Sequence, residues 1–232
     1  PCVVGGQGDD SRSGYHHMMQ MLNNSSPSGA TPLCRHIHEI TAQIRTMEQQ
    51  LRANGHKAVI VICTDGEASD GDLAQALAPL KSLPVWVVVQ LCTGEDNVVN
   101  YWNNIDQQLE LDMDILDDLV SEAKEVHAHN KWFTYGEPLH RMRGFGIAVK
   151  ELDLLDEVAL SPDQIRDVCA LIFGGSVDDY PHPDVDAKNF MAAVSSANKK
   201  EDKTWSPIHK KPRYWIEASE MKSVVGGKCT IM

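Results

Sequence analysis

Two unbroken apolar runs, residues 57–63 (KAVIVIC) and 84–92 (PVWVVVQLC), constrain the fold of this 232-residue chain more than any other feature. Both runs are rich in β-branched residues, do not alternate between apolar and polar positions, and are too short for buried helices. Strands of this kind are covered on both faces, as in a parallel sheet. Between them, residues 70–83 carry leucines at helical spacing. The sequence therefore predicts a βαβ unit with two adjacent, central, parallel strands.

Helices are predicted on either side of this unit. Residues 31–55 form the clearest one, with Thr31 as N-cap, Pro32 at the first helical position and Gly55 as the stop. Residues 95–109 and 112–129 are also predicted to be helical.

The domain organisation follows from a change of character along the chain. We expect an α/β domain at residues 1–135, a helical extension at residues 136–198 and an extended basic tail at residues 199–232, where periodicity is lost. The expected fold class is α/β, an open and mostly parallel sheet with helices on both faces.

Composition excludes some classes of function. The formal net charge is −12 at pH 7, which argues against nucleic acid as the main partner because phosphate binding needs clustered Lys and Arg. A metal ion suits so acidic a surface better. The six cysteines are scattered without a CxxC pair, which favours a reducing, cytoplasmic environment. No apolar run approaches the ~20 residues of a membrane-spanning helix.

A candidate metal site lies where the first apolar run ends. Asp65 follows that run directly, and ligands of open parallel sheets bind at the carboxyl ends of the strands. Thr31 begins the preceding helix, so its hydroxyl can reach the same edge. A hydroxyl beside a carboxylate suits Mg²⁺ or a similar hard cation. The alternative is purely structural, since Thr-Pro is a common helix start and Asp-Gly a common turn.

The motifs around these two residues resemble the second half of a von Willebrand factor A (VWA) domain. The resemblance rests on SPSGATPL, residues 26–33, and AVIVICTDGEASDGD, residues 58–72. It implies a Rossmann-like sheet and a metal-ion-dependent adhesion site that includes Thr31 and Asp65. It also implies a non-enzymatic protein–protein interaction module that binds Mg²⁺ (or Ca²⁺ or Mn²⁺), with an acidic side chain of a partner protein completing the cation's shell.

This family also uses D-x-S-x-S at the end of its first strand. The chain has that spacing at Asp9, Ser11 and Ser13, but only 17 residues separate Ser13 from Thr31. The resemblance requires a helix and a hairpin in that interval. We therefore interpret the match as accidental, and expect the family's first strand either before Pro1 or not at all.

Two other classes of function are weighed against the interaction module. A hydrolytic enzyme with a Cys or His centre would need partners that meet in space rather than in sequence. The paired histidines, such as His36 and His38, are one or two residues apart and point in different directions on a helix, so we interpret them as solvated surface. A structural subunit with a decayed metal site is the third class.

The last four residues, Cys229-Thr-Ile-Met, fit the C-a-a-X prenylation motif, and a terminal methionine favours farnesyl. From Lys199 onward, basic residues outnumber acidic ones. One lipid chain binds a membrane only marginally, and basic residues supply the second contact. We therefore predict lipidation of Cys229 and peripheral association with the cytoplasmic face of a membrane.

Overall fold

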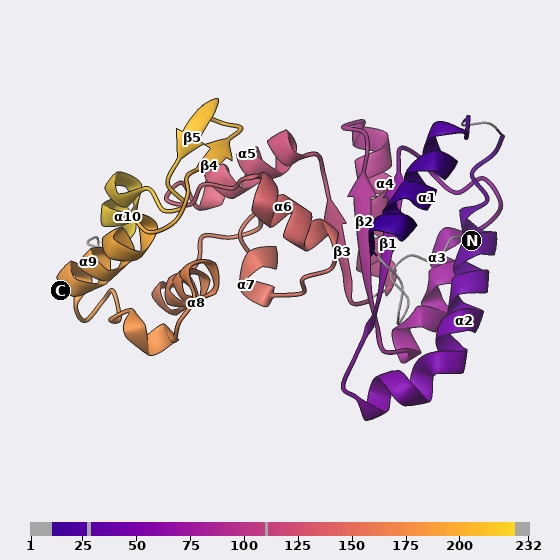
Figure 1. Ribbon diagram of the computed structural model, residues 1–232, viewed down its shortest axis with the longest axis horizontal. Helices are drawn as coiled ribbons and strands as arrows, with labels where there is room; N and C mark the ends of the chain where they lie inside the picture. The colour runs from indigo at the N-terminus through magenta and orange to yellow at the C-terminus, as the bar shows by residue number, and fades with distance from the viewer. Residues whose placement is uncertain (1–10, 27–28, 110, 226–232) are drawn as a thin grey trace.

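The protein is described by a computed structural model that covers residues 11–26, 29–109 and 111–225. Its elements form two parts that lie side by side along the long axis of the molecule (Figure 1). One part is a parallel sheet with its helices, and the other is mostly helical. Each part has its own buried apolar cluster, one within residues 34–111 and the other within residues 123–225. The boundary between the two cores therefore falls between residues 111 and 123, before the expected domain boundary at residue 135.

Three parallel strands form the sheet, in the order β1–β2–β3. They are β1 (Ala58–Thr64), β2 (Val85–Leu91) and β3 (Met113–Leu116). β1 and β2 pair along their whole length, with Ala58 opposite Val85 and Thr64 opposite Leu91. The predicted α/β fold class and the parallel pairing of the two apolar runs are confirmed.

β3 is a strand that the sequence analysis missed, because residues 112–129 were expected to form one helix. It pairs with β2 over residues 87–90. The helix α5 (Leu119–His129) begins only after Asp118, whose carboxylate accepts hydrogen bonds from the N–H groups of Val120 and Ser121. This cap fixes the start of α5 and leaves the preceding residues to extend the sheet.

One face of the sheet is covered by the helices of the first part. These are α2 (Leu33–Ala53), α3 (Leu73–Leu77) and α4 (Asp96–Leu109), with the 3-10 turn η1 (Ala78–Ser82) leading into β2. Their apolar side chains share a core with the inward-facing residues of β1 and β2. At about 25 cal/mol per Å² of apolar surface, this burial is the main stabilising contribution to this part.

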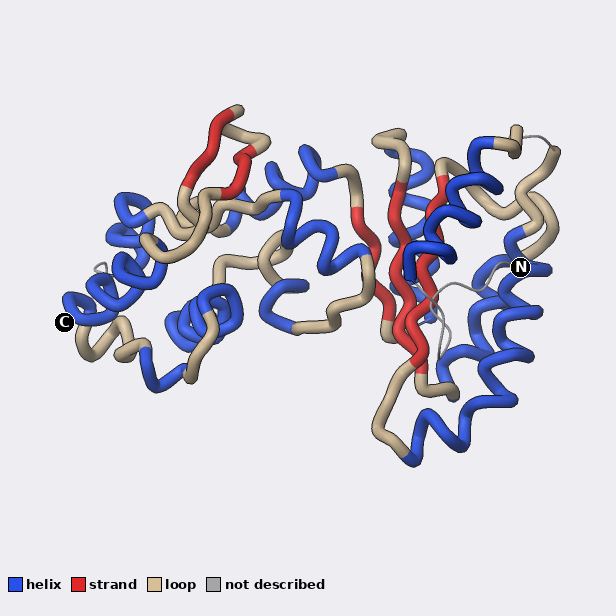
Figure 2. The backbone as a smooth tube through the Cα atoms, in the orientation of Figure 1, coloured by secondary structure: helices blue, strands red, loops and turns tan. Residues whose placement is uncertain are grey.

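The second part surrounds the other core with short helices and one small hairpin (Figure 2). Besides α5, its elements are α6 (Glu137–Gly144), α7 (Lys150–Asp153), α8 (Pro162–Phe173), η2 (Val177–Asp179), α9 (Ala187–Asn198), β4 (Thr204–Ser206), β5 (Lys211–Arg213) and α10 (Ala218–Val225).

The second face of the sheet is covered only in part, by the end of α6. Gln90 Nε2 donates a hydrogen bond to the Gly144 carbonyl at 2.7 Å. A Cβ at Gly146 would lie 2.4 Å from the Val59 side chain, so this close contact requires glycine. Val59 and Val61 stay 45% and 38% exposed. The prediction that β1 is central and covered on both faces is therefore wrong, and β1 is an edge strand among the strands that the structure describes.

The expected extended tail is also wrong over the described residues. β4 and β5 pair antiparallel, and α10 places Met221 in the second core. The side chain of Asn198 donates to the carbonyl of Ile216 at 2.7 Å and accepts from its N–H at 3.3 Å. Periodicity was absent because each element is too short to show it. Cys229 lies outside the described residues.

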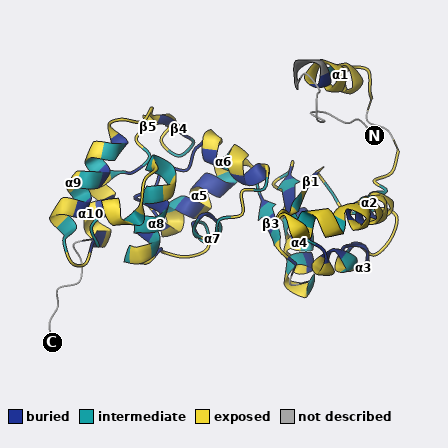
Figure 3. Ribbon diagram, turned by 60° about the horizontal axis from the view of Figure 1, so that its bottom comes forward, coloured by how far each residue is buried: buried dark blue, intermediate teal, exposed yellow. Residues whose placement is uncertain are grey.

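Helix α1 (Ser11–Asn23) stands away from both parts (Figure 3). Its apolar side chains are largely exposed, with Tyr15 at 54% and Leu22 at 61%. Within the described ranges, no helix is both long and apolar enough to cross a membrane.

Candidate functional site

The structure brings the two predicted site loops together at the carboxyl end of β1. The Ser69 N–H, in the turn after β1, donates to the carbonyl of Thr31 at 3.0 Å. The Asp70 carboxylate, in the same turn, accepts from the N–H groups of Cys34 at 3.0 Å and Arg35 at 2.9 Å. These bonds join the turn to the first residues of α2, as the metal-site hypothesis requires.

The same bonds correct the predicted start of α2. Thr31 was expected to cap it, but Pro32 occupies the N-cap position and provides no side-chain hydrogen bond. The carboxylate of Asp70 satisfies the free N–H groups instead. Burial acts to raise the pKa of Asp70, yet the hydrogen bonds from Arg35 and Cys34 outweigh it and hold that pKa below its usual value. The Asp70 carboxylate therefore caps the N-terminus of α2 and is not free to bind a metal ion.

Two further hydrogen bonds hold the turn after β1 in place, one from α4 and one within the turn itself. The indole Nε1 of Trp102, a fully buried residue of α4, donates to the carbonyl of Gly66 at 3.3 Å. The Thr64 hydroxyl accepts from the Gly66 N–H at 3.2 Å. Asp65 lies between these two anchored residues, and its side chain is exposed. The backbone around Asp65 is thus held in place while its carboxylate faces solvent.

Thr31 is exposed at the same edge, so two oxygen donors are available to a cation there. A hard cation such as Mg²⁺ takes six oxygen ligands, and the others would be water or groups from a partner. Ser11 and Ser13 belong to α1, and Asp9 lies outside the described residues. Thr31 and Asp65 are therefore both exposed at the carboxyl end of β1.

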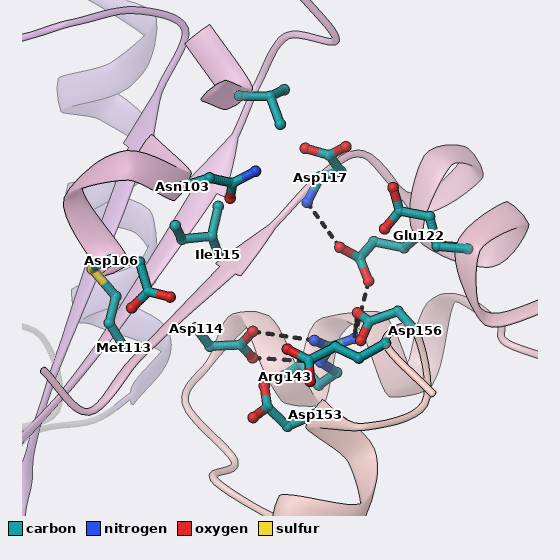
Figure 4. Close-up of a pocket in the computed structure, with 13 residues that line it drawn as sticks. Asn103, Asp106, Met113, Asp114, Ile115, Asp117, Glu122, Arg143, Asp153 and Asp156 are labelled. Atoms are coloured by element: carbon teal, nitrogen blue, oxygen red, sulfur yellow. Dashed lines mark hydrogen bonds and ion pairs between the residues drawn. The ribbon is translucent and has the colours of Figure 1, made fainter. Parts of the chain in front are cut away.

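A second polar site, which the sequence analysis missed, lies between the two parts of the molecule (Figure 4). It is a cavity of about 240 Å³ beside β3, α4 and α5. Eight carboxylates and one guanidinium line it: Asp106, Asp114, Asp117, Glu122, Glu125, Asp153, Asp156, Glu157 and Arg143. The cavity is therefore strongly acidic.

Arg143, from α6, is the centre of this cluster and is only 2% exposed. Its Nη2 lies 3.1 Å from Asp114 of β3, and its Nη1 lies 2.9 Å from Glu122 of α5 and 3.1 Å from Asp156. Tyr135 lies under the guanidinium, with 6.0 Å between the ring centroid and Cζ. Arg143 thus connects the sheet with the helical part by buried charge-assisted hydrogen bonds.

One arginine does not neutralise the carboxylates around it. Burial raises the pKa of Glu122 to about 9, and the charge of Asp156 adds to this, against the opposing attraction of Arg143. Burial also raises the pKa of Asp153, to about 6, with the charge of Asp114 adding to the shift. Because Glu122 titrates together with its neighbours, the cluster retains near neutral pH a proton that belongs to the group of carboxylates around Glu122.

Three of these carboxylates could hold a metal ion. Oxygen atoms of Glu122, Glu125 and Asp156 lie within 4.8 Å of one another, and no other group of three His, Cys, Asp or Glu residues within the described ranges does so. Two of the three already bind Arg143. Because Arg143 and the retained proton offset much of this charge, we interpret the cluster as a structural joint between the two parts.

The described cysteines do not support a hydrolytic centre. Burial raises the pKa of the Cys34 thiol, and a hydrogen bond to Asp70 adds to this. The thiols of Cys63 and Cys92 contact the side-chain and backbone oxygens of Gln90, at 3.8 Å each. Cys169 is buried in the second core, and burial raises its pKa to about 12. Raised pKa values keep the Cys34, Cys63 and Cys169 thiols protonated and weakly nucleophilic.

Comparison with known proteins adds no further assignment. No family model, curated protein or solved structure matches this chain.

Proposed function

We propose that this protein is a non-enzymatic, VWA-type interaction module that binds a partner protein at the carboxyl end of β1. Thr31 and Asp65 would supply oxygen ligands to a divalent cation, with Mg²⁺ the best match and Ca²⁺ or Mn²⁺ the alternatives. An acidic side chain of the partner would complete the shell. The observation that supports this most directly is the hydrogen bond from the Ser69 N–H to the Thr31 carbonyl, because it joins the turn after Asp65 to the loop that carries Thr31.

The proposal is consistent with how the two acidic sites differ. In the cavity between the parts, Arg143 already binds three buried or half-buried carboxylates. Asp65 is exposed on an anchored turn instead. An exposed, rigidly held carboxylate can bind a cation that a partner can also reach.

We expect Asp65→Ala to abolish binding of Mg²⁺ and Mn²⁺ to the full chain while its circular dichroism spectrum stays unchanged. Titration calorimetry with each metal measures the loss. Glu67→Ala is the matched control, since Glu67 is an exposed carboxylate in the same turn, and it should keep binding. If the unaltered chain binds neither metal, the interaction module gives way to the alternative of a structural subunit with a decayed site.

Peripheral association with the cytoplasmic face of a membrane remains part of the proposal. It rests on the C-a-a-X motif at Cys229 and on exposed basic residues of the hairpin, among them Lys203, Lys210 and Lys211. Trp205, 54% exposed on β4, gives the hairpin an aromatic side chain suited to a membrane interface.

We expect Cys229 to be farnesylated in the cell, so that the protein leaves anionic membranes as salt rises, because salt screens the basic residues. Intact-mass measurement of protein from its native host tests this directly. Cys229→Ser should be found off membranes at every salt concentration. A native mass with free Cys229 and the last three residues still attached would contradict the prediction.

A further inference from the structure

The outer edge of β1 has unpaired backbone groups. Ala58 N–H donates to the carbonyl of Pro84, and the Thr64 carbonyl accepts from Cys92, so both residues bond toward β2. Because successive residues of a strand alternate in direction, the backbone groups of Val59, Val61 and Cys63 point to the opposite edge. No other strand of the described ranges pairs there.

Nothing in the sequence of β1 blocks this edge. Residues 58–64 contain no proline, glycine or charged residue, which are the usual means of preventing a new strand from pairing. The side chains of Val59, Val61 and Cys63 are exposed on one face. Phe145, 74% exposed, and Ile147, 38% exposed, flank the glycine that contacts Val59. Together they form an apolar patch of the kind that marks an interaction surface.

The charges at the ends of β1 complement one another. Lys57 precedes the strand and Asp65 follows it. If a second copy of β1 ran antiparallel with Val61 opposite Val61, each Lys57 would lie opposite the other copy's Asp65. The same register pairs all of residues 58–64, Val59 lying opposite Cys63. Lys57 also pairs with Asp112 of its own chain at 2.6 Å, so its ammonium group would be shared.

We infer that two copies of this chain associate through the free edges of β1, forming one continuous sheet of six strands across a two-fold axis at Val61. Each copy uses its only free β1 edge, so the assembly closes at two. In this register a cation and Lys57 of the second copy would compete for the Asp65 carboxylate. The inference does not depend on metal binding.

Cysteine cross-linking tests the register. Residues that lie directly opposite in an antiparallel hydrogen-bonded pair have Cα atoms about 5.5 Å apart, within reach of a disulfide. Val61→Cys, made with Cys63→Ser, should give a covalent dimer on mild oxidation, joined through position 61. Val59→Cys in the same background is the matched control. It should not form a covalent dimer, because the Cα atoms of its two copies would lie about 14 Å apart. Cross-linking at 59 but not at 61 would overturn the inference.

Sedimentation velocity over a concentration series tests the association itself. The unaltered chain should shift from monomer to dimer and no further. Val61→Lys should remain monomeric, because two lysines would face each other at the axis. Val185→Lys, at a position 85% exposed in the helical part, should dimerise like the unaltered chain. A chain that stays monomeric throughout, or that forms larger aggregates without the 61–61 link, overturns the inference.

Discussion

Replacing Arg143 by methionine should destabilise the protein by about 3–5 kcal/mol, the usual cost of removing one partner from a buried ion pair. Methionine retains most of the side-chain volume but leaves Asp114 and Glu122, 6% and 2% exposed, without their cation. Asp156 would lose the same partner. Urea unfolding at neutral pH, followed by circular dichroism, measures the change in the free energy of unfolding.

Arg141→Met is the matched control for this experiment. Arg141 lies in the same helix and forms an ion pair with Glu137, but both side chains are more than half exposed. Exposed pairs of this kind contribute about 0.2–1 kcal/mol. If the two variants lose similar amounts of stability, Arg143 does not hold the two parts together.

The stability of the protein should fall as pH rises above neutrality, by up to about 1.4 kcal/mol per pH unit for one retained proton. The pKa of Glu122 rises from 4.5 to about 9 on folding. Between these values the folded state holds a proton that the unfolded state has lost. A pKa raised by folding contributes stability that is fully present below the unfolded value and is lost as pH approaches the folded value.

Other titratable groups also change the free energy of unfolding with pH, but mainly outside the range just above neutrality. The pKa of Asp153 reaches only about 6. Burial lowers the pKa of His140 below 6.5, which gives a slope of opposite sign below neutrality. The raised pKa values of the Cys34, Cys63 and Cys169 thiols add a slope of the same sign as pH approaches 9.

Unfolding free energies measured from about pH 7 to 8 therefore report mainly on the carboxylates around Glu122. Glu122→Gln should flatten the slope, whereas Glu220→Gln should leave it unchanged. An unaltered slope in Glu122→Gln would show that Glu122 is ionised in the folded protein.

The sheet was predictable because its first two strands carry their own signal. Residues 58–63 and 84–89 are apolar at every position, and such short runs rich in β-branched residues indicate strands rather than helices. β3 was not predictable in the same way, since MDIL is four residues long and is surrounded by acidic residues. The exposure of Val59 and Val61 could not be predicted from the sequence either, because an apolar run does not show whether helices cover the second face of the sheet.

Of the candidate sites, the loops at Thr31 and Asp65 were predictable from strand direction alone, since the end of a parallel strand and the start of the preceding helix share one edge. The cluster around Arg143 was not. Its partners are 29, 21 and 13 residues away in the chain, in stretches whose acidic residues suggested a solvated surface. The i,i+3 spacing of Glu122 and Glu125 on α5 was the one local signal, and it is common on exposed helices.

The position of Arg143 also bears on how the molecule comes apart. Two apolar cores are joined across an acidic contact whose attraction depends on how many protons its carboxylates retain. In alkaline solution the repulsion in that contact grows, while the packing inside each core is unaffected. The contact between the two parts is therefore the boundary that alkaline solution weakens most directly.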